Sequence, residues 1–205
     1  MFRKHFNNLY QVVFVRHYAL KNSRLEPVKS NLAYKQERQE KLPDFKYPTT
    51  FKPTTDIETF LDKYMYLDRG QNLVEENGIQ MAGRIHSMRD MGKNLVFLDL
   101  HQREFRVQVK AHKNFYEGDF KGDISKIGRG DIVGIVDGYP GKTKAGELSI
   151  IPKKIEILAP CMKRLPETSF ENLGFKYRHR HVDLMLNPQV RAFFYTRSKI
   201  INSIR

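Results

Sequence analysis

Hydrophobic and polar residues alternate along five stretches in the middle of the chain, as they do in strands that bury one face of a sheet. In the second stretch, Val96, Leu98 and Leu100 share one face. Phe97 falls on the opposite face, beside Asp99. The five stretches cover residues 78–88, 94–101, 104–111, 130–138 and 147–157. The pattern therefore predicts a small antiparallel β-structure that carries a large aromatic ring on its polar face.

The order of the predicted elements indicates a particular barrel. A helical segment is expected at about 117–127, between the third and fourth strands. Three strands, a helix and two strands is the order of an OB-fold, a five-stranded Greek-key barrel that binds oligonucleotides on its strand 2–3 face and flanking loops. Other antiparallel barrels are alternatives, but the helix position favours this one. We expect a mainly β fold with helical flanks, in which the OB-fold covers residues 77–160.

Residues 26–76 are expected to form a helical extension in front of the barrel. The first part, 27–42, is polar and helix-prone, and prolines then interrupt it. A capping box at 55–58 predicts the start of a second helix. The hydrophobic face of that helix, which we expect to pack on the barrel, consists of Ile57, Phe60, Leu61 and Tyr64.

The pattern changes again after the barrel. Residues 161–186 are expected to be a linker, and Asn187 followed by Pro188 predicts a helix start. The helix over 187–205 has a hydrophobic stripe and no stop signal at its end. We therefore expect it to be the start of a further domain, an α/β domain beginning with a helix, which the sequence cuts short.

The polar face of the predicted barrel carries the candidate chemistry. Arg106, Gln108 and Lys110 of the third strand fall on the same side as Phe97. An aromatic ring beside cationic and amide side chains suits base stacking and recognition of base edges. Two alternatives remain for Phe97: a surface ring that pairs across strands, or a core ring if the register shifts by one residue.

Charge and cysteine content restrict the partners and the kind of site. The formal net charge is +13 and the isoelectric point about 9.8, which favours a polyanionic partner: RNA, DNA or an anionic membrane surface. The longest hydrophobic run is far too short to span a membrane, so no membrane insertion is expected. Cys161 is the single cysteine, which excludes an intramolecular disulfide, and the histidine spacing argues against a zinc site.

The first 25 residues are basic and contain no acidic residue. Hydrophobic residues recur there at helical spacing, so the segment is typical of a mitochondrial transit peptide. The alternative is a basic arm that helps to hold RNA. We expect the mitochondrial matrix as the location, with the cytoplasm as the alternative.

Several segments resemble lysyl-tRNA synthetase, a class II aminoacyl-tRNA synthetase. Residues 81–85 (MAGRI), 130–134 (GDIVG) and 141–150 (GKTKAGELSI) resemble its anticodon-binding barrel. Residues 177–187 (YRHRHVDLMLN) resemble the segment that enters its catalytic domain, and 191–205 resemble the start of its motif 1 helix. Two positions depart from the family pattern, His181 where tyrosine is common and Pro188.

The resemblance implies roles for individual residues. Phe97 corresponds to the ring on which an anticodon uridine stacks, and Gln108 to the amide that hydrogen-bonds a uracil edge. Arg89 corresponds to an arginine that contacts the anticodon loop, and Glu147 lies in a loop that also meets the anticodon. Contacts to the RNA backbone are expected from Arg84, Arg106, Lys110, Lys142 and Lys144.

The resemblance also implies a reaction and its requirements. The family joins lysine to tRNA(Lys) with ATP and Mg²⁺, through an enzyme-bound lysyl-adenylate, and it is homodimeric through motif 1. Motifs 2 and 3, which hold ATP, the metal and lysine, are absent from this sequence, and motif 1 is incomplete, which weighs against a dimer. We expect the chain to bind the tRNA(Lys) anticodon stem-loop and, by itself, to bind no cofactor and catalyse nothing. The rival functions are a non-catalytic OB-fold protein that binds single-stranded nucleic acid, and a scaffold protein.

Overall fold

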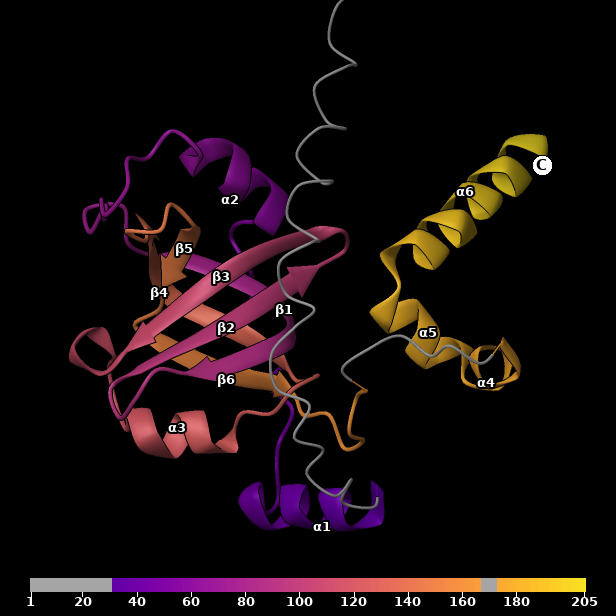
Figure 1. Ribbon diagram of the computed structural model, residues 1–205, viewed down its shortest axis with the longest axis horizontal. Coiled ribbons are helices and arrows are strands. Elements are labelled where there is room, and N and C mark those ends of the chain that lie inside the picture. Colours follow the sequence, from indigo (N-terminus) through magenta and orange to yellow (C-terminus); the bar gives the residue numbers. More distant parts are fainter. Residues whose placement is uncertain (1–30, 167–172) are drawn as a thin grey trace, which may run out of the picture. The chain divides into compact units, whose positions relative to one another are not determined.

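The computed structural model describes residues 31–166 and 173–205, and the predicted transit peptide at 1–25 lies outside this part of the chain. A β-barrel follows two helices, and three further helices follow the barrel (Figure 1). The elements are α1 (Asn31–Lys41), α2 (Ile57–Tyr64), β1 (Ile79–Asp90), β2 (Leu95–Gln102), β3 (Phe105–His112), the 3₁₀ turn η1 (Lys113–Phe115), α3 (Phe120–Lys126), β4 (Ile132–Lys142), β5 (Leu148–Ile151), β6 (Lys154–Ala159), α4 (Leu173–Arg178), α5 (Arg180–Leu186) and α6 (Pro188–Ile204).

The sheet closes into the predicted OB-fold. Its strand order is β1-β2-β3-β5-β4-β6, and β1 pairs again with β4, which closes a five-stranded barrel. The β3–β5 pairing is parallel, and the other pairings are antiparallel. Helix α3 lies between β3 and β4 in the chain, where the sequence pattern predicted a helix. The fold class inferred from the order of elements is confirmed.

The predicted fifth strand, 147–157, is wrong as a single element. The chain forms β5, breaks at Pro152 and Lys153, and continues as β6. Proline has no N–H to donate to a ladder, so a strand commonly ends there. As a result β5 bridges β3 and β4, whereas β6 pairs with β4.

The core follows the predicted alternation. Val96, Leu98 and Leu100 are buried inside the barrel. Helix α2 covers the barrel with its hydrophobic face, and Ile57 and Phe60 have no exposed surface. Burying side chains of this size typically contributes about 1.5–3 kcal/mol each, so the barrel and α2 form one folding unit.

Helix α2 begins differently from the prediction. The N-cap is Asp56, whose side chain makes no capping bond, so the predicted capping box is wrong. Instead Gln102, at the end of β2, accepts a hydrogen bond from the backbone N–H of Ile57 at 2.9 Å and donates to the Asp56 carboxylate at 3.0 Å. One of the unpaired N–H groups in the first turn thus finds its acceptor on another element.

Helix α1 is joined to the barrel by a buried ion pair. Arg38 donates to Asp131 at 2.6 Å and to the carbonyl of Lys126 at 2.5 Å. The side chains of Arg38 and Asp131 are 3 % and 0 % exposed. Burial raises the pKa of the Asp131 carboxyl, and the backbone N–H groups of Cys161 and Gly128 together with Arg38 oppose this rise. The pattern of residues in the sequence does not predict this ion pair.

Two short helices lie in the stretch predicted as a linker. Residues 173–178 form α4 and residues 180–186 form α5. Helix α6 begins where Asn187 and Pro188 predicted, although the Asn187 side chain accepts no capping hydrogen bond and its amide donates to Asp183. Exposed hydrophobic residues on α6 are Phe193, Tyr195, Ile200, Ile201 and Ile204. Within the described ranges, no helix is both long and hydrophobic enough to cross a membrane.

Candidate nucleic-acid interface

Phe97 lies on the outer face of the barrel between two cationic residues. It pairs with Arg89 of β1 on one side and with Lys110 of β3 on the other. Its neighbours in sequence, Val96 and Leu98, are buried, whereas Phe97 is partly exposed. The outward orientation predicted from alternation is confirmed. The ring is therefore accessible and flanked by positive charge.

A β-bulge in β1 brings Arg89 to this face. The β1–β2 register shifts between Ile85 and Ser87, so His86 is an extra residue in β1. Strict alternation from the buried Ile85 would point Ser87 and Arg89 into the core. The bulge reverses this, and Arg89 comes to lie opposite Phe97. Strict alternation requires hydrophobic residues at positions 87 and 89. The polar residues found there are the signal in the sequence that predicts the bulge.

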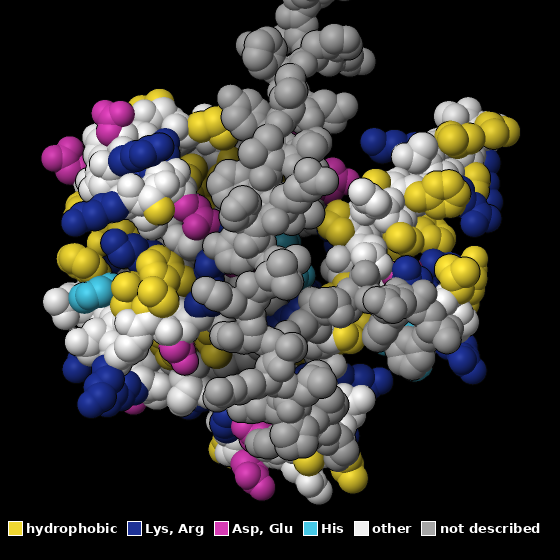
Figure 2. Space-filling view, viewed as in Figure 1, with side chains coloured by type: hydrophobic (Ala, Val, Ile, Leu, Met, Phe, Trp, Pro, Cys, Tyr) yellow, Lys and Arg dark blue, Asp and Glu magenta, His cyan; other side chains and the backbone are white. Residues whose placement is uncertain are grey.

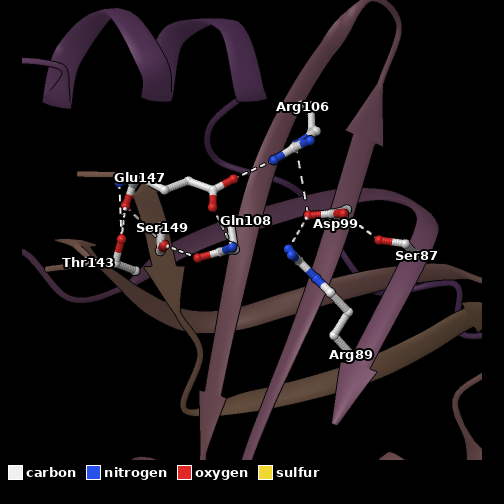
Figure 3. Close-up of polar contacts among 8 residues, drawn as sticks. All are labelled: Ser87, Arg89, Asp99, Arg106, Gln108, Thr143, Glu147 and Ser149. Carbon is white, nitrogen blue, oxygen red and sulfur yellow. Dashed lines mark hydrogen bonds and ion pairs between the residues drawn. The ribbon is translucent and has the colours of Figure 1, made fainter. Parts of the chain in front are cut away.

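Asp99 is the acidic centre of the face (Figure 3). It is 8 % exposed and accepts a hydrogen bond from the Ser87 hydroxyl. Arg89 approaches its carboxylate at 3.5 Å and Arg106 at 3.8 Å. Two arginines that are candidates for RNA contacts are thus held in place by one carboxylate.

Gln108 and Glu147 are in direct contact. The Gln108 Nε2 group donates to Glu147 Oε2 at 2.7 Å, and the Ser149 hydroxyl donates to Gln108 Oε1 at 2.9 Å. Arg106 donates to the other oxygen of Glu147. Figure 3 shows these side chains converging from β3, from β5 and from the turn that precedes β5. The structure therefore brings together Gln108, Glu147 and Arg106 of the predicted set, and it adds Ser149, which sequence analysis missed.

A tight turn between β4 and β5 positions Glu147. The backbone N–H of Glu147 donates to the Thr143 hydroxyl at 3.0 Å, and its carbonyl accepts from the Thr143 N–H at 2.9 Å. Gly146 adopts a φ of +92°, a conformation that glycine accepts without strain. The turn thus holds the Glu147 carboxylate over β3.

Two histidines stack beside the arginines. The rings of His86 and His101 lie 4.6 Å apart and are inclined by 23°. Burial, together with the neighbouring His86 and Arg106, lowers the pKa of His101 to about 4. Burial and Arg129 lower the pKa of His86 as well. The two rings are therefore neutral at pH 7 and extend the aromatic surface of the outer face.

The other residues predicted to contact RNA backbone divide into two groups. Arg84 donates to a backbone carbonyl before β4 at 2.7 Å, and Lys142 donates to the carbonyl of Leu67 at 2.7 Å. These two cations thus bind carbonyls of the protein itself. Lys110 lies beside Phe97, and Lys144 is exposed in the β4–β5 turn. The second pair is placed to meet a polyanion.

Within 31–166 and 173–205, no group of three or more His, Cys, Asp or Glu side chains could hold a metal ion. The outer face offers groups for non-covalent contacts: an aromatic ring, an amide, arginines and lysines. Figure 2 shows Lys and Arg side chains distributed over the barrel, interspersed with hydrophobic and acidic ones. Such a surface suits binding of a base-bearing polyanion.

Comparison with known proteins agrees with this geometry. Residues 79–158 match the tRNA anticodon family model, described as an OB-fold nucleic acid binding domain. Over 168 residues the chain is 36% identical to lysine–tRNA ligase cla4 of Cladosporium cladosporioides, a match that covers 78% of this chain and 28% of that protein. The lysine–tRNA ligase of Magnetococcus marinus is 34% identical, with 78% of this chain and 32% of that protein covered.

A third relative extends the match slightly. The lysine–tRNA ligase of Buchnera aphidicola is 34% identical over 189 residues, which covers 85% of this chain and 36% of that protein. The chain therefore spans about a third of the length of the curated relatives it matches.

Proposed function

We propose that the β1–β3 face of this chain binds the anticodon of tRNA(Lys). The premise is that the chain is a homologue of the lysine–tRNA ligases and contains their OB-fold nucleic-acid-binding domain. The observation that carries the proposal is the position of Phe97 between Arg89 and Lys110. A base stacked on the ring would place its phosphates near both cations. Stacking of this kind is worth about 1–3 kcal/mol per base.

Recognition of the base would come from Gln108. Gln108 is only 5 % exposed, so a base must displace some of the polar side chains that cover its amide. Arg106 is the accessible part of that cover, because 43 % of its side chain is exposed. We propose that Arg106 and Arg89 exchange the Asp99 carboxylate for phosphates when RNA binds, while Arg106 keeps its contact with Glu147. Such an exchange makes the affinity depend on salt.

The reaction that this recognition serves is also a proposal. We propose that it takes part in ATP- and Mg²⁺-dependent lysylation of tRNA(Lys), and that the 205-residue chain alone binds tRNA without forming lysyl-adenylate. The similarity to lysine–tRNA ligases supports the part in lysylation. Exchange of pyrophosphate into ATP in the presence of lysine is expected to be absent for the chain alone, and measurable exchange would overturn the proposal.

Two further features of the proposal need their own assays. The basic, acid-free residues 1–25 support import into the mitochondrial matrix, which a fluorescent fusion tests, and diffuse cytoplasmic signal would overturn it. Light scattering of the 205-residue chain would show whether it is a monomer or a homodimer.

The experiment that tests RNA recognition compares two ligands. The chain is titrated with the anticodon stem-loop of tRNA(Lys) and with one whose anticodon uridines are changed to cytidines, at moderate and high salt. A preference for uridine that persists at high salt supports anticodon recognition. Equal binding that vanishes with salt would overturn it and support the second candidate, a sequence-independent binder of single-stranded nucleic acid.

A further inference from the structure

A glutamine amide can recognise either of two pyrimidines, and its orientation decides which. Uracil presents an N–H donor beside carbonyl acceptors, whereas cytosine presents a ring-nitrogen acceptor beside an amino donor. The amide of Gln108 carries one acceptor and one donor group side by side. Turned one way it complements uracil, and rotated by 180° it complements cytosine. A glutamine that is free to rotate therefore discriminates poorly between them.

Glu147 removes this freedom. Its carboxylate has oxygens only, so it accepts hydrogen bonds and cannot donate them. Gln108 Nε2 lies 2.7 Å from Glu147 Oε2. A rotated amide would place its carbonyl oxygen against that carboxylate, bringing two acceptors into contact where there was a charge-assisted hydrogen bond. The carboxylate therefore selects one amide orientation.

Ser149 supports this orientation without determining it. Its hydroxyl lies 2.9 Å from Gln108 Oε1 and 3.3 Å from the backbone carbonyl of Glu147. A hydroxyl both donates and accepts. It could donate to the Glu147 carbonyl and accept from a rotated amide, so it tolerates both orientations. The choice between them falls to the carboxylate.

The carboxylate is itself held by two elements. Arg106 occupies Glu147 Oε1 and leaves Oε2 for Gln108. The Thr143 turn fixes the backbone of Glu147 through hydrogen bonds in both directions. Glu147 thus reaches Gln108 from a fixed backbone and with a cation on its far oxygen, as Figure 3 shows.

We propose that Glu147 is a specificity-determining residue that fixes the Gln108 amide in the orientation that selects uridine over cytidine. The proposal rests on the proposed function, because it requires an RNA base at Gln108. In this role Glu147 is a positioning residue, and its effect appears in the ratio of two affinities. Loss of a negative charge raises affinity for both RNAs alike, so the ratio separates orientation from charge.

The test uses Glu147→Gln, which preserves shape but can both donate and accept. Wild-type protein and variant are titrated with the tRNA(Lys) anticodon stem-loop and with versions carrying one uridine-to-cytidine change each. We expect wild-type protein to prefer uridine at one position by tenfold or more. Glu147→Gln should reduce that preference to less than threefold, chiefly through tighter binding of the cytidine version. Ser149→Ala should keep most of the preference.

A matched control removes the same charge elsewhere. Glu104 is exposed in the β2–β3 turn, and Glu104→Gln should leave the ratio unchanged. Far-UV circular dichroism and thermal unfolding establish that each variant is folded. Glu147→Met, which removes the acceptor altogether, is the second variant and should lose the preference in the same way.

The outcomes are distinguishable. If wild-type protein shows no uridine preference, the proposed function fails. If wild-type protein shows the preference and both Glu147 variants retain it, the orientation proposal fails while anticodon binding stands. Loss of the preference in both variants, with retention in Glu104→Gln, supports the proposal.

Discussion

Arg38 of α1 and Asp131 at the start of β4 form an ion pair with 2.6 Å between nitrogen and oxygen, and both side chains are almost completely buried. Ninety-three residues separate them in the sequence. Asp131 also accepts hydrogen bonds from the backbone N–H groups of Gly128 and Cys161 at 2.7 Å. This carboxylate therefore joins α1, the turn before β4 and the segment that leaves the barrel.

Replacement of Arg38 by methionine should destabilise the fold strongly. Methionine fills similar space but leaves Asp131 as a buried charge without its cation, and breaking a buried pair in this way costs about 3–5 kcal/mol. Urea unfolding followed by far-UV circular dichroism measures the change, since the chain has no tryptophan. Lys35→Met, on the exposed side of α1, is the control and should change stability by less than about 0.5 kcal/mol. Equal effects of the two substitutions would contradict a stabilising role for the pair.

Phe97→Ala should weaken binding to the uridine-rich anticodon stem-loop about tenfold or more. Loss of one stacked base costs on the order of 1–3 kcal/mol, and 1.4 kcal/mol corresponds to tenfold. Fluorescence anisotropy with a labelled stem-loop measures the affinity. Phe97→Tyr keeps the aromatic face and should bind nearly as wild-type protein does. A folded alanine variant with unchanged affinity would remove Phe97 from the interface.

Lys110→Met should reduce the salt dependence of RNA binding. A lysine that neutralises one phosphate of a single strand contributes about 0.7 to the slope of log affinity against log salt. Lys110 lies beside Phe97, whereas Lys154 lies on β6, which pairs with β4. The slope should therefore fall for Lys110→Met and stay constant for Lys154→Met. A common slope for both variants would show that Lys110 meets no phosphate.

Gln102→Met should destabilise the fold by about 1 kcal/mol, because it leaves the N–H of Ile57 without its acceptor. Thr55→Ala provides the comparison. The capping box predicted from the sequence gives Thr55 the capping role, whereas the structure places the N-cap at Asp56. Urea unfolding should show a small change for Thr55→Ala. A larger loss for Thr55→Ala than for Gln102→Met would support the capping box instead.

Stability should fall as the pH is lowered from about 6.5 towards 4, because His86 and His101 are kept neutral in the fold. Their folded pKa values lie below the unfolded value, so the unfolded state binds more protons in this window and stability rises with pH. The charged groups that face the two rings are Asp99, Arg106, Arg129 and Arg191.

The His101 contribution amounts to about 2–3 kcal/mol between pH 7.5 and 4.5. Urea unfolding at these two values measures it. His101→Gln should show a smaller loss of stability on acidification than wild-type protein, and equal losses would show that the ring does not titrate in this way.

The outward position of Phe97 was predictable because alternation with period two is a local property of the chain. The same holds for the inward positions of Val96 and Leu98, and the order of elements was enough to identify the OB-fold. The position of Arg89 was harder to predict from the sequence. Alternation alone assigns it to the core, and its place on the outer face depends on a bulge that appears only when β1 pairs with β2.

Local patterns in the sequence were enough to predict which residues alternate, the helix start at Pro188, and an aromatic and cationic face on the barrel. The tertiary structure decided the contacts between distant residues. It places Gln102 at the start of α2, Arg38 on Asp131, and Glu147 and Ser149 around the Gln108 amide. Local propensity and periodicity act over a few residues, whereas these hydrogen bonds join side chains that only the closed barrel brings within 3 Å of one another.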